Sequence, residues 1–448
     1  RYPRRIVAAV AVAGVLIIAG GMWRLWPSPQ APSPTTTAPA ARGSAAPRLS
    51  IVVLPFGNLS NDPEQQYFAD GITEDLTTDL SRIADSFVIS RNTAFTYKDK
   101  PVNAKQIGRE LGVRYVLEGS VQRSGKQVRV NAQLINAETD AHVWAERLER
   151  DIGDLFALQN EVTSRIAIAL NFALIGAEAA RQTANPDAQD YIFRGRAVQA
   201  KPPSREVNAE AIGLFERALA LDPHSTEAQI RLASAILSPV LNSMSKTAAV
   251  DIARAEGLLG QALTASPNTP LAHNVKGNLL RAQRRYVEAI PEYQAVIALD
   301  RNSPDAYANL AQCKLFTGSI DEVIPLTEQA IRLSPRDRSL VFWYAQIGRV
   351  HLYQSRTDEA ILWSEKARTA APEHPFPHVN LAAAYGLKGE SERAAAELAE
   401  ARRLSGNPDS FSSIARLRAA GSFLAPNIRA LGEATTLVGL RKAGMPEE

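Results

Sequence analysis

The chain has 448 residues, an apolar content of 45% and a formal net charge of +3. This length is sufficient for two or three domains, and the apolar content excludes a wholly disordered chain. The net charge gives no reason to expect a nucleic-acid partner, because nucleic-acid-binding domains usually concentrate basic side chains on one face. The single cysteine, Cys313, excludes an internal disulfide and is expected to be a small buried residue.

The N-terminal segment, residues 1–26, has the pattern of a membrane anchor. Residues 6–23 form an uncharged run of 18 residues, which is long enough to cross a bilayer as one helix. Arginines precede this run, and Trp23 and Trp26 lie where an interfacial aromatic belt is expected. The positive-inside rule predicts a single-pass inner-membrane protein with a cytoplasmic N-terminus and periplasmic C-terminal domains.

The same run has an alternative interpretation as a cleaved signal peptide, with the cleavage site at Ala38–Ala41. Residues 27–47 are rich in Pro, Ala and Thr and are expected to form a semi-extended linker. Under either interpretation, the rest of the chain is exported.

Residues 48–174 have the pattern of a compact α/β domain. Short β-branched runs predict buried strands, apolar residues at helical spacing predict amphipathic helices, and alternation broken by turn signals predicts an antiparallel meander. The expected elements are strands at 49–56 and 86–91, helices at 66–83, 105–113 and 155–170, and the meander at 114–150.

Three strings in this region, VVLPFGNLSNDPEQQYFADGITEDL, IGRELGVRYVLEGSV and RVNAQLINAETDAHVWAERLERD, resemble the TolB amino-terminal-type domain. The resemblance implies a domain that in bacteria precedes tetratricopeptide repeats in many membrane-anchored signalling proteins. Asp99 and Asp140 stand where relatives usually have turn glycines. The fold tolerates this difference because Asp adopts turn conformations.

The α/β domain offers no pattern typical of catalysis. It lacks GxxxxGK[ST], GxGxxG and GxSxG, so no nucleotide cradle, cofactor site or catalytic nucleophile is expected. Its acidic residues near a helix start are best interpreted as complementing the helix dipole, with a divalent-metal site as the alternative. These residues are Asp62, Glu64, Asp70, Glu74 and Asp75, with no His or Cys nearby.

The second half of the chain repeats with a period near 34 residues. Helix-like segments end, at intervals of 44, 34, 34, 37 and 34 residues, at Pro223, Pro267, Arg301, Pro335, Pro372 and Gly406. That period is typical of tetratricopeptide repeats, in which each helix–turn–helix unit must stack on its neighbours to bury its apolar face. We therefore expect an all-α solenoid of about six units over residues 186–408, followed by capping helices over residues 409–448.

Polar amides and arginines on the first helices of such an array suit an extended peptide backbone, and the concave side is the usual contact surface. By register the candidates are Asn274, Asn278, Arg281, Gln312, Arg349 and Tyr353. A solvated face is the plain alternative for each of them. His374 and His378 could share a metal on a regular helix, but Pro375 and Pro377 argue against a helix there, so no metal site is expected.

Together these features predict a non-catalytic protein that binds a protein or peptide ligand. The order of anchor, TolB-like domain and repeats resembles the C-terminal half of bacterial class III adenylate/guanylate cyclases. The resemblance implies a catalytic domain upstream of residue 1, a homodimer, and no cyclase activity in this chain itself. Two alternatives stay open: the outer part of a membrane-bound winged-helix transcription regulator, and a free-standing periplasmic scaffold for envelope assembly.

Overall fold

The computed structural model describes residues 46–60, 62–83, 85–98, 100, 103–151, 155–181, 185–201, 204–242, 244–405 and 411–448. The chain divides into two units, Arg1–Ala46 and Pro47–Glu448, and the second is compact. The expected anchor at residues 6–23, nearly all of the expected linker, Asp99 and Gly406 lie outside the described residues. All strands and helices of the described residues belong to the second unit.

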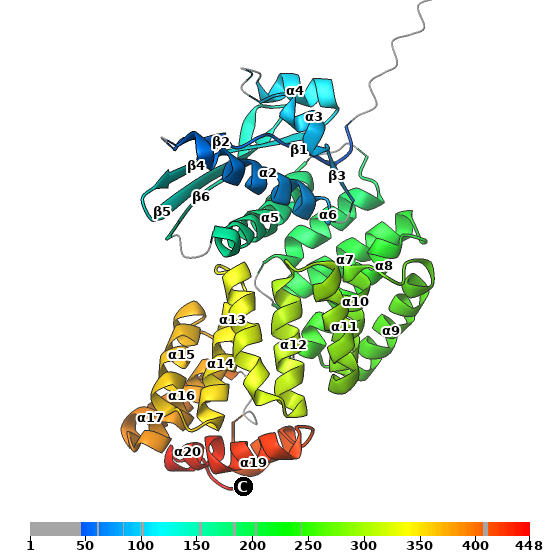
Figure 1. Cartoon of the computed structure of the whole chain (residues 1–448). Coiled ribbons are helices and arrows are strands. Elements are labelled where there is room, and N and C mark those ends of the chain that lie inside the picture. The colour runs from blue at the N-terminus through cyan, green and yellow to red at the C-terminus, as the bar shows by residue number, and fades with distance from the viewer. Residues whose placement is uncertain are drawn as a thin grey trace, which may run out of the picture. The chain divides into compact units, whose positions relative to one another are not determined.

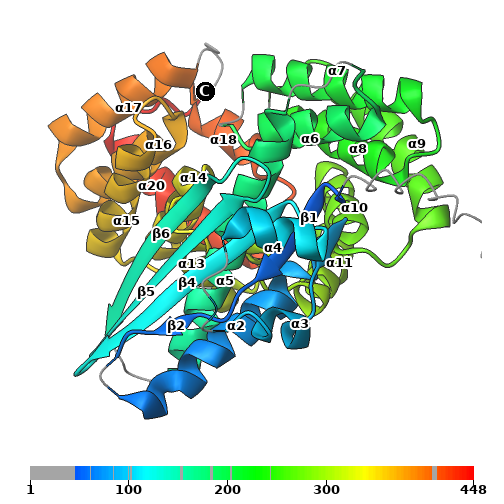
Figure 2. The ribbon, with the colours of Figure 1, turned by 90° about the horizontal axis from the view of Figure 1, so that it is seen from above.

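A six-stranded mixed sheet forms the centre of the N-terminal domain (Figures 1 and 2). Its main strand order is β3-β1-β4-β5-β6, with the short β2 paired to β4. β1 runs parallel to β3 and β4, whereas β4, β5 and β6 form an antiparallel meander. The strands are β1 (Leu49–Val53), β2 (Gly57–Asn58), β3 (Ser86–Val88), β4 (Tyr115–Ser124), β5 (Gln127–Asn136) and β6 (Ala141–Asp151).

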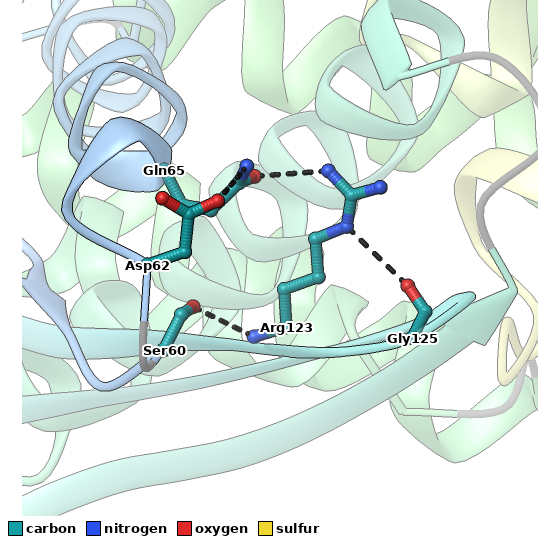
Figure 3. A pocket seen from close by; sticks show the side chains of 5 residues that line it. All are labelled: Ser60, Asp62, Gln65, Arg123 and Gly125. Carbon is teal, nitrogen blue, oxygen red and sulfur yellow. Dashed lines mark hydrogen bonds between the residues drawn. The ribbon is translucent and has the colours of Figure 1, made fainter.

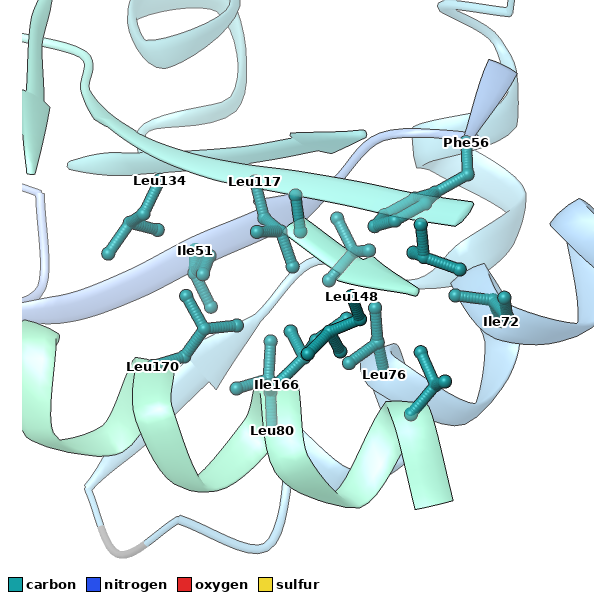
Figure 4. Close-up of a cluster of buried hydrophobic side chains, with 14 of the residues drawn as sticks. Ile51, Phe56, Ile72, Leu76, Leu80, Leu117, Leu134, Leu148, Ile166 and Leu170 are labelled. Atoms are coloured by element: carbon teal, nitrogen blue, oxygen red, sulfur yellow. The ribbon is translucent and has the colours of Figure 1, made fainter. Parts of the chain in front are cut away.

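Helices cover both faces of this sheet, which explains why β1 is apolar at consecutive positions. Ile51 and Val53 pack against α2 and α5, whereas Val52 points to the opposite face and packs near α3 and α4. Figure 4 shows the first of these cores, with Leu76 and Leu80 of α2 meeting Ile166 and Leu170 of α5 below the sheet. The helices are α2 (Gln66–Leu80), α3 (Arg91–Phe95), α4 (Ala104–Leu111) and α5 (Leu155–Ala179), with a short 3₁₀ helix at Pro63–Gln65.

Within the described residues, one helical stretch, Ala157–Ala179 of α5, is long and apolar enough to cross a membrane. Leu158, Val162, Ile166 and Leu170 of this helix are buried in the core under the sheet. The apolar character of α5 is therefore explained by its packing.

Residues 188–405 form six antiparallel helix pairs, drawn from green to orange in Figure 1. In three of the pairs a glycine of the first helix allows the second to approach closely: an added Cβ atom would lie 2.5 Å from the Phe215 ring at Gly195, 2.8 Å from the Tyr293 ring at Gly277 and 2.7 Å from Oγ of Ser364 at Gly348. The pairs are α6 (Ala188–Gln199) with α7 (Arg205–Leu221), α8 (Thr226–Leu241) with α9 (Ala248–Ala265), α10 (Pro270–Ala282) with α11 (Tyr286–Leu299), α12 (Pro304–Thr317) with α13 (Val323–Leu333), α14 (Leu340–Tyr353) with α15 (Thr357–Ala370), and α16 (Pro375–Lys388) with α17 (Ser391–Ser405).

Three short helices follow the last pair: α18 (Ile414–Ala420), α19 (Pro426–Ala434) and α20 (Thr436–Lys442). Residues 411–445, which we call the C-terminal segment, turn back over earlier pairs, so that α19 contacts α12 and α14 and α20 contacts α16. The segment therefore covers part of the first-helix surface of the array.

Candidate functional site

Six polar residues form a stripe on two successive first helices. Each helix contributes residues at positions i, i+4 and i+7, a spacing that places side chains on one face. We call this set the polar stripe, and it consists of Asn274, Asn278 and Arg281 on α10 and Asp305, Asn309 and Gln312 on α12.

Arg281 joins the two halves of the polar stripe. Its Nη1 donates to Oδ1 of Asn309 at 2.8 Å and to Oδ1 of Asn278 at 3.3 Å, and its Nη2 contacts Gln312. The Tyr293 hydroxyl of α11 donates to Oδ1 of Asn278 at 2.7 Å, and this bond orients the Asn278 amide. The guanidinium is thus held in place by groups on three helices.

Two buried atoms of the stripe have no hydrogen-bond partner among the described residues: Nε of Arg281 and Oδ1 of Asn274. Buried polar atoms in proteins are nearly always paired, because leaving one unpaired carries its full desolvation penalty. One is a donor and the other an acceptor, and they lie on the same face of α10. A bound peptide chain offers a C=O group for the first atom and, from another peptide unit, an N–H group for the second.

Asp305 adds a titratable carboxyl to the stripe. Its side chain has open surface, yet protein atoms surround it, and this desolvation, together with repulsion from Asp337, raises its pKa to about 6.

The other two sequence candidates lie outside this group. Arg349 of α14 is half-buried and has no hydrogen-bond or ion-pair partner in the described part of the chain. Tyr353 is only 8% exposed, because it packs with Ile428 of α19. The structure therefore brings together Asn274, Asn278, Arg281 and Gln312, and places Tyr353 under the C-terminal segment.

Sequence reasoning missed Asp305 and Asn309, which belong to the same arrangement. The signal was present, since their spacing with Gln312 repeats the spacing of Asn274, Asn278 and Arg281.

The C-terminal segment covers the first-helix surface next to the polar stripe. Ile428 is fully buried in a cluster with Ala311, Leu315 and Val350. The backbone N–H of Ala425 donates to the carbonyl of Phe316 at 2.9 Å, and Nδ2 of Asn427 donates to the carbonyl of Gly318 at 3.0 Å. We call the surface beneath this segment, on α12, α14 and α16, the covered face.

The helix crossing between α16 and α20 is unusually close. A Cβ atom at Gly439 would lie 2.1 Å from the carbonyl oxygen of Ala383, and one at Gly386 would lie 2.0 Å from the carbonyl oxygen of Gly439. Glycine at both positions is therefore required for this contact.

Asp70, Glu74 and Asp75 of the α/β domain are paired with side chains, and the first turn of α2 contains no acidic residue. Asp70 pairs with Lys98 at 3.1 Å, and Asp75 accepts a hydrogen bond from Nε2 of Gln159 at 2.8 Å. Glu74 forms an ion pair with Arg91 of α3, at 3.4 Å between Oε2 and Nε. Within the described residues, no group of three or more His, Cys, Asp or Glu side chains could hold a metal ion.

The expectation that prolines prevent a helix near His374 is wrong. α16 begins at Pro375, because the first turn of a helix tolerates proline, whose missing N–H would be unpaired there anyway. Nδ1 of His374 accepts from the backbone N–H of Phe376 at this helix start, and His378 contacts Glu397 at 2.6 Å. Each histidine thus has its own structural partner.

A depression of about 330 Å³ lies at the tip of the α/β domain, beside the β4–β5 turn (Figure 3). Its polar groups satisfy one another: Arg123 donates from Nη1 to Gln65 at 3.1 Å and from its backbone N–H to Ser60 at 2.9 Å, and Gln65 donates to Asp62 at 3.0 Å. The depression is therefore a weaker candidate than the polar stripe.

Family models match the chain in two regions. Two tetratricopeptide-repeat models match residues 248–307 and 280–347, which include the polar stripe. A model described as the second domain of HilA/YgeH-like transcriptional regulators matches residues 47–165.

A curated relative from Rhizobium meliloti (strain 1021), named "Putative adenylate cyclase 3", is 39% identical over 273 residues. The match covers 60% of this chain and 46% of the relative, so the chain spans about half the length of that protein.

Among solved structures, PilF of Pseudomonas aeruginosa is 17% identical with a TM-score of 0.38, covering 50% of this chain and 93% of that one. The Cut9–Hcn1 complex is 16% identical with a TM-score of 0.43, covering 57% of this chain and 47% of that one. These scores are too low to support a functional argument. The chain carries tetratricopeptide repeats behind a small N-terminal sheet domain, and such repeats are typical of protein–protein interaction.

Proposed function

We propose that this chain is the non-catalytic, protein-binding part of an adenylate/guanylate cyclase-type signalling protein, and that its polar stripe binds an extended peptide. The observation that carries the binding site is the pair of unpaired buried atoms on α10, Nε of Arg281 and Oδ1 of Asn274. A backbone amide and carbonyl of a bound peptide would pair with them. Asn309 and Gln312 fix the orientation of the Arg281 guanidinium before the peptide binds.

The cyclase assignment rests on the similarity to the adenylate cyclase-named relative. In this proposal the catalytic domain lies upstream of residue 1, residues 6–23 anchor the protein in the inner membrane, and the TolB-like domain and the repeats lie in the periplasm. Arg349, on the next first helix, extends the binding surface.

A second function is favoured by the match of residues 47–165 to the second domain of HilA/YgeH-like transcriptional regulators. Here the same binding module would follow a winged-helix DNA-binding domain. The reading frame upstream of residue 1 separates the two proposals, because it encodes a cyclase domain in the first and a winged helix in the second.

Panning of a random peptide library displayed on phage against the purified full chain tests the binding site. We expect recovered peptides to bind the wild type and to lose about tenfold in affinity, or about 1.4 kcal/mol, when Arg281→Gln removes the fork that joins α10 to α12. Titration calorimetry measures the change, and thermal unfolding checks that the variant is folded.

Arg254→Gln is the matched control, because Arg254 lies on the second helix α9 and pairs with Glu216 at 2.6 Å. It should leave peptide affinity unchanged. Peptides that bind the Arg281→Gln variant as well as the wild type would contradict the proposed site, and cyclic AMP production from ATP by the purified chain would contradict its non-catalytic role.

A further inference from the structure

The last strand of the sheet, β6, has one edge without a strand partner in the described part of the chain. It pairs with β5 on one side and ends the strand order on the other. At 11 residues it is among the longest strands of this sheet, and Figure 2 shows it lying alongside β5 over much of that length. Long open edges expose backbone N–H and C=O groups that can pair with another strand, and proteins usually block them with charges that repel such a strand.

The charges on β6 are arranged differently. The charges at the centre of β6 are arranged symmetrically about Leu148, with opposite signs on its two sides. Arg147 and Glu149 are one residue from Leu148, and Glu146 and Arg150 are two residues from it. If two copies of β6 pair antiparallel about a two-fold axis at Leu148, each Arg147 lies opposite Glu149 of the other copy. Each Glu146 then lies opposite Arg150 of the other copy. All four charged positions are matched.

Strand geometry and charge together restrict the register. Only every second residue of a strand directs its backbone N–H and C=O groups to the open edge, so two copies of the same edge can pair only about an axis that passes through a residue and not between two residues. Moving the axis to Arg147 places that arginine opposite its own copy, and moving it to Glu149 does the same for the glutamate. Directly opposed like charges destabilise a pair of strands, whereas opposite charges stabilise it.

The neighbours of β6 continue the alternation of charge on both faces of the sheet. On one face Arg129 pairs with Glu149 at 2.8 Å. On the other face Glu161 pairs with Arg150 at 2.9 Å, and Arg165 lies 3.7 Å from Glu146. A second copy would extend the first of these rows to Arg129, Glu149 and Arg147 of the second copy, so that opposite charges alternate across it.

We propose that β6 is a homodimerisation edge, which pairs with β6 of a second copy of this chain about an axis at Leu148. At present Nη1 of Arg150 donates to the backbone carbonyl of Glu149 at 2.8 Å. In the dimer the second strand takes over that carbonyl, and the guanidinium of Arg150 turns to Glu146 of the second copy. This edge is separate from the polar stripe, so the proposal does not depend on peptide binding.

Analytical ultracentrifugation of the purified full chain, in one detergent throughout, tests the proposal through charge reversal. Arg147→Glu and Glu149→Arg each place like charges opposite one another on both sides of the axis, so each variant alone should dissociate about tenfold more readily than the wild type. An equimolar mixture of the two variants restores opposite charges at every pair, and it should form heterodimers with wild-type affinity.

Lys126→Glu, in the exposed β4–β5 turn away from this edge, is the matched control and should leave dimerisation unchanged. Thermal unfolding of each variant confirms folding. A monomeric wild type at micromolar concentrations would overturn the proposal. So would dimers that survive both single reversals, or folded variants whose mixture stays monomeric.

Discussion

The polar stripe on α10 and α12 and the covered face on α12, α14 and α16 share one helix of the array, yet they use opposite chemistry. The covered face is apolar and closely approached, with Ile428 fully buried and Gly439 in contact with the backbone of α16. The polar stripe carries amides and a guanidinium, and two of its buried atoms have no partner in the described chain.

This difference indicates what each surface binds. The chain's own C-terminal segment packs on the apolar surface and buries it, as side chains do in a hydrophobic core. The polar stripe offers amides and a guanidinium as hydrogen-bonding groups, so its ligand is expected to be recognised by its backbone. If the covered face is a packed core and the polar stripe a binding surface, four substitutions should have the following effects.

The largest effect is expected from Ile428→Ala, which removes the central apolar side chain of the covered face. Truncation of a fully buried Ile typically lowers the free energy of unfolding by about 2–5 kcal/mol, and urea denaturation measures it. Val287→Ala is the control, because Val287 is 71% exposed and its loss should change stability by less than about 0.5 kcal/mol. Equal stabilities of the two variants would show that the C-terminal segment contributes no core.

Gly439→Ala should lower stability by about 1–3 kcal/mol, because the added Cβ atom must displace the backbone of α16 or detach α20. Limited proteolysis should then cleave the C-terminal segment faster than in the wild type. Gly213→Ala in α7 is the matched change, since nothing lies within 4 Å of its Cβ position. Alanine there should stabilise the helix by about 0.5–1 kcal/mol, and similar effects at both sites would refute the close crossing.

Tyr293→Phe tests the support behind the polar stripe. The variant removes the hydroxyl that donates to Asn278 at 2.7 Å, and thermal unfolding should show a loss of about 0.5–1.5 kcal/mol. Peptide affinity should also fall, because Asn278 in turn contacts Arg281. A variant that loses stability but keeps full affinity would separate the tyrosine from the binding site.

The smallest effect concerns Asp305, whose pKa rises from 3.8 to about 6 in the folded chain, first through burial and then through Asp337. Since the folded state holds the proton more tightly, the carboxyl favours folding at pH 4, and this contribution is lost as the pH rises through about 6. The side chain has open surface, so solvent screening should keep the effect below about 1 kcal/mol. Asp305→Asn should flatten the dependence of unfolding free energy on pH between 4 and 7, and an unchanged slope would count against the raised pKa.

Much of the fold follows from local pattern. The alternation in 114–150 predicted the meander, and the 34-residue spacing predicted the stacked helix pairs. These features depend on side chains close together in sequence, so their period is visible without a structure.

The path of the C-terminal segment could not be predicted in the same way. Asn427 binds the carbonyl of Gly318, 109 residues away, and no local period encodes a contact of that range. For the same reason Tyr353 was selected from its register as a ligand contact, although α19 covers it. Two of the other five candidates, Asn278 and Gln312, contact Arg281, because register within α10 and α12 is a local property.

Hydrogen–deuterium exchange of the full chain, with and without a peptide recovered from the library, shows directly which helices the bound peptide protects. Bound peptide should slow exchange in α10, in α12 and in the part of α14 around Arg349, and should leave α16 and the C-terminal segment unchanged. Protection confined to the C-terminal segment or to the second helices of the array would contradict the proposed binding site.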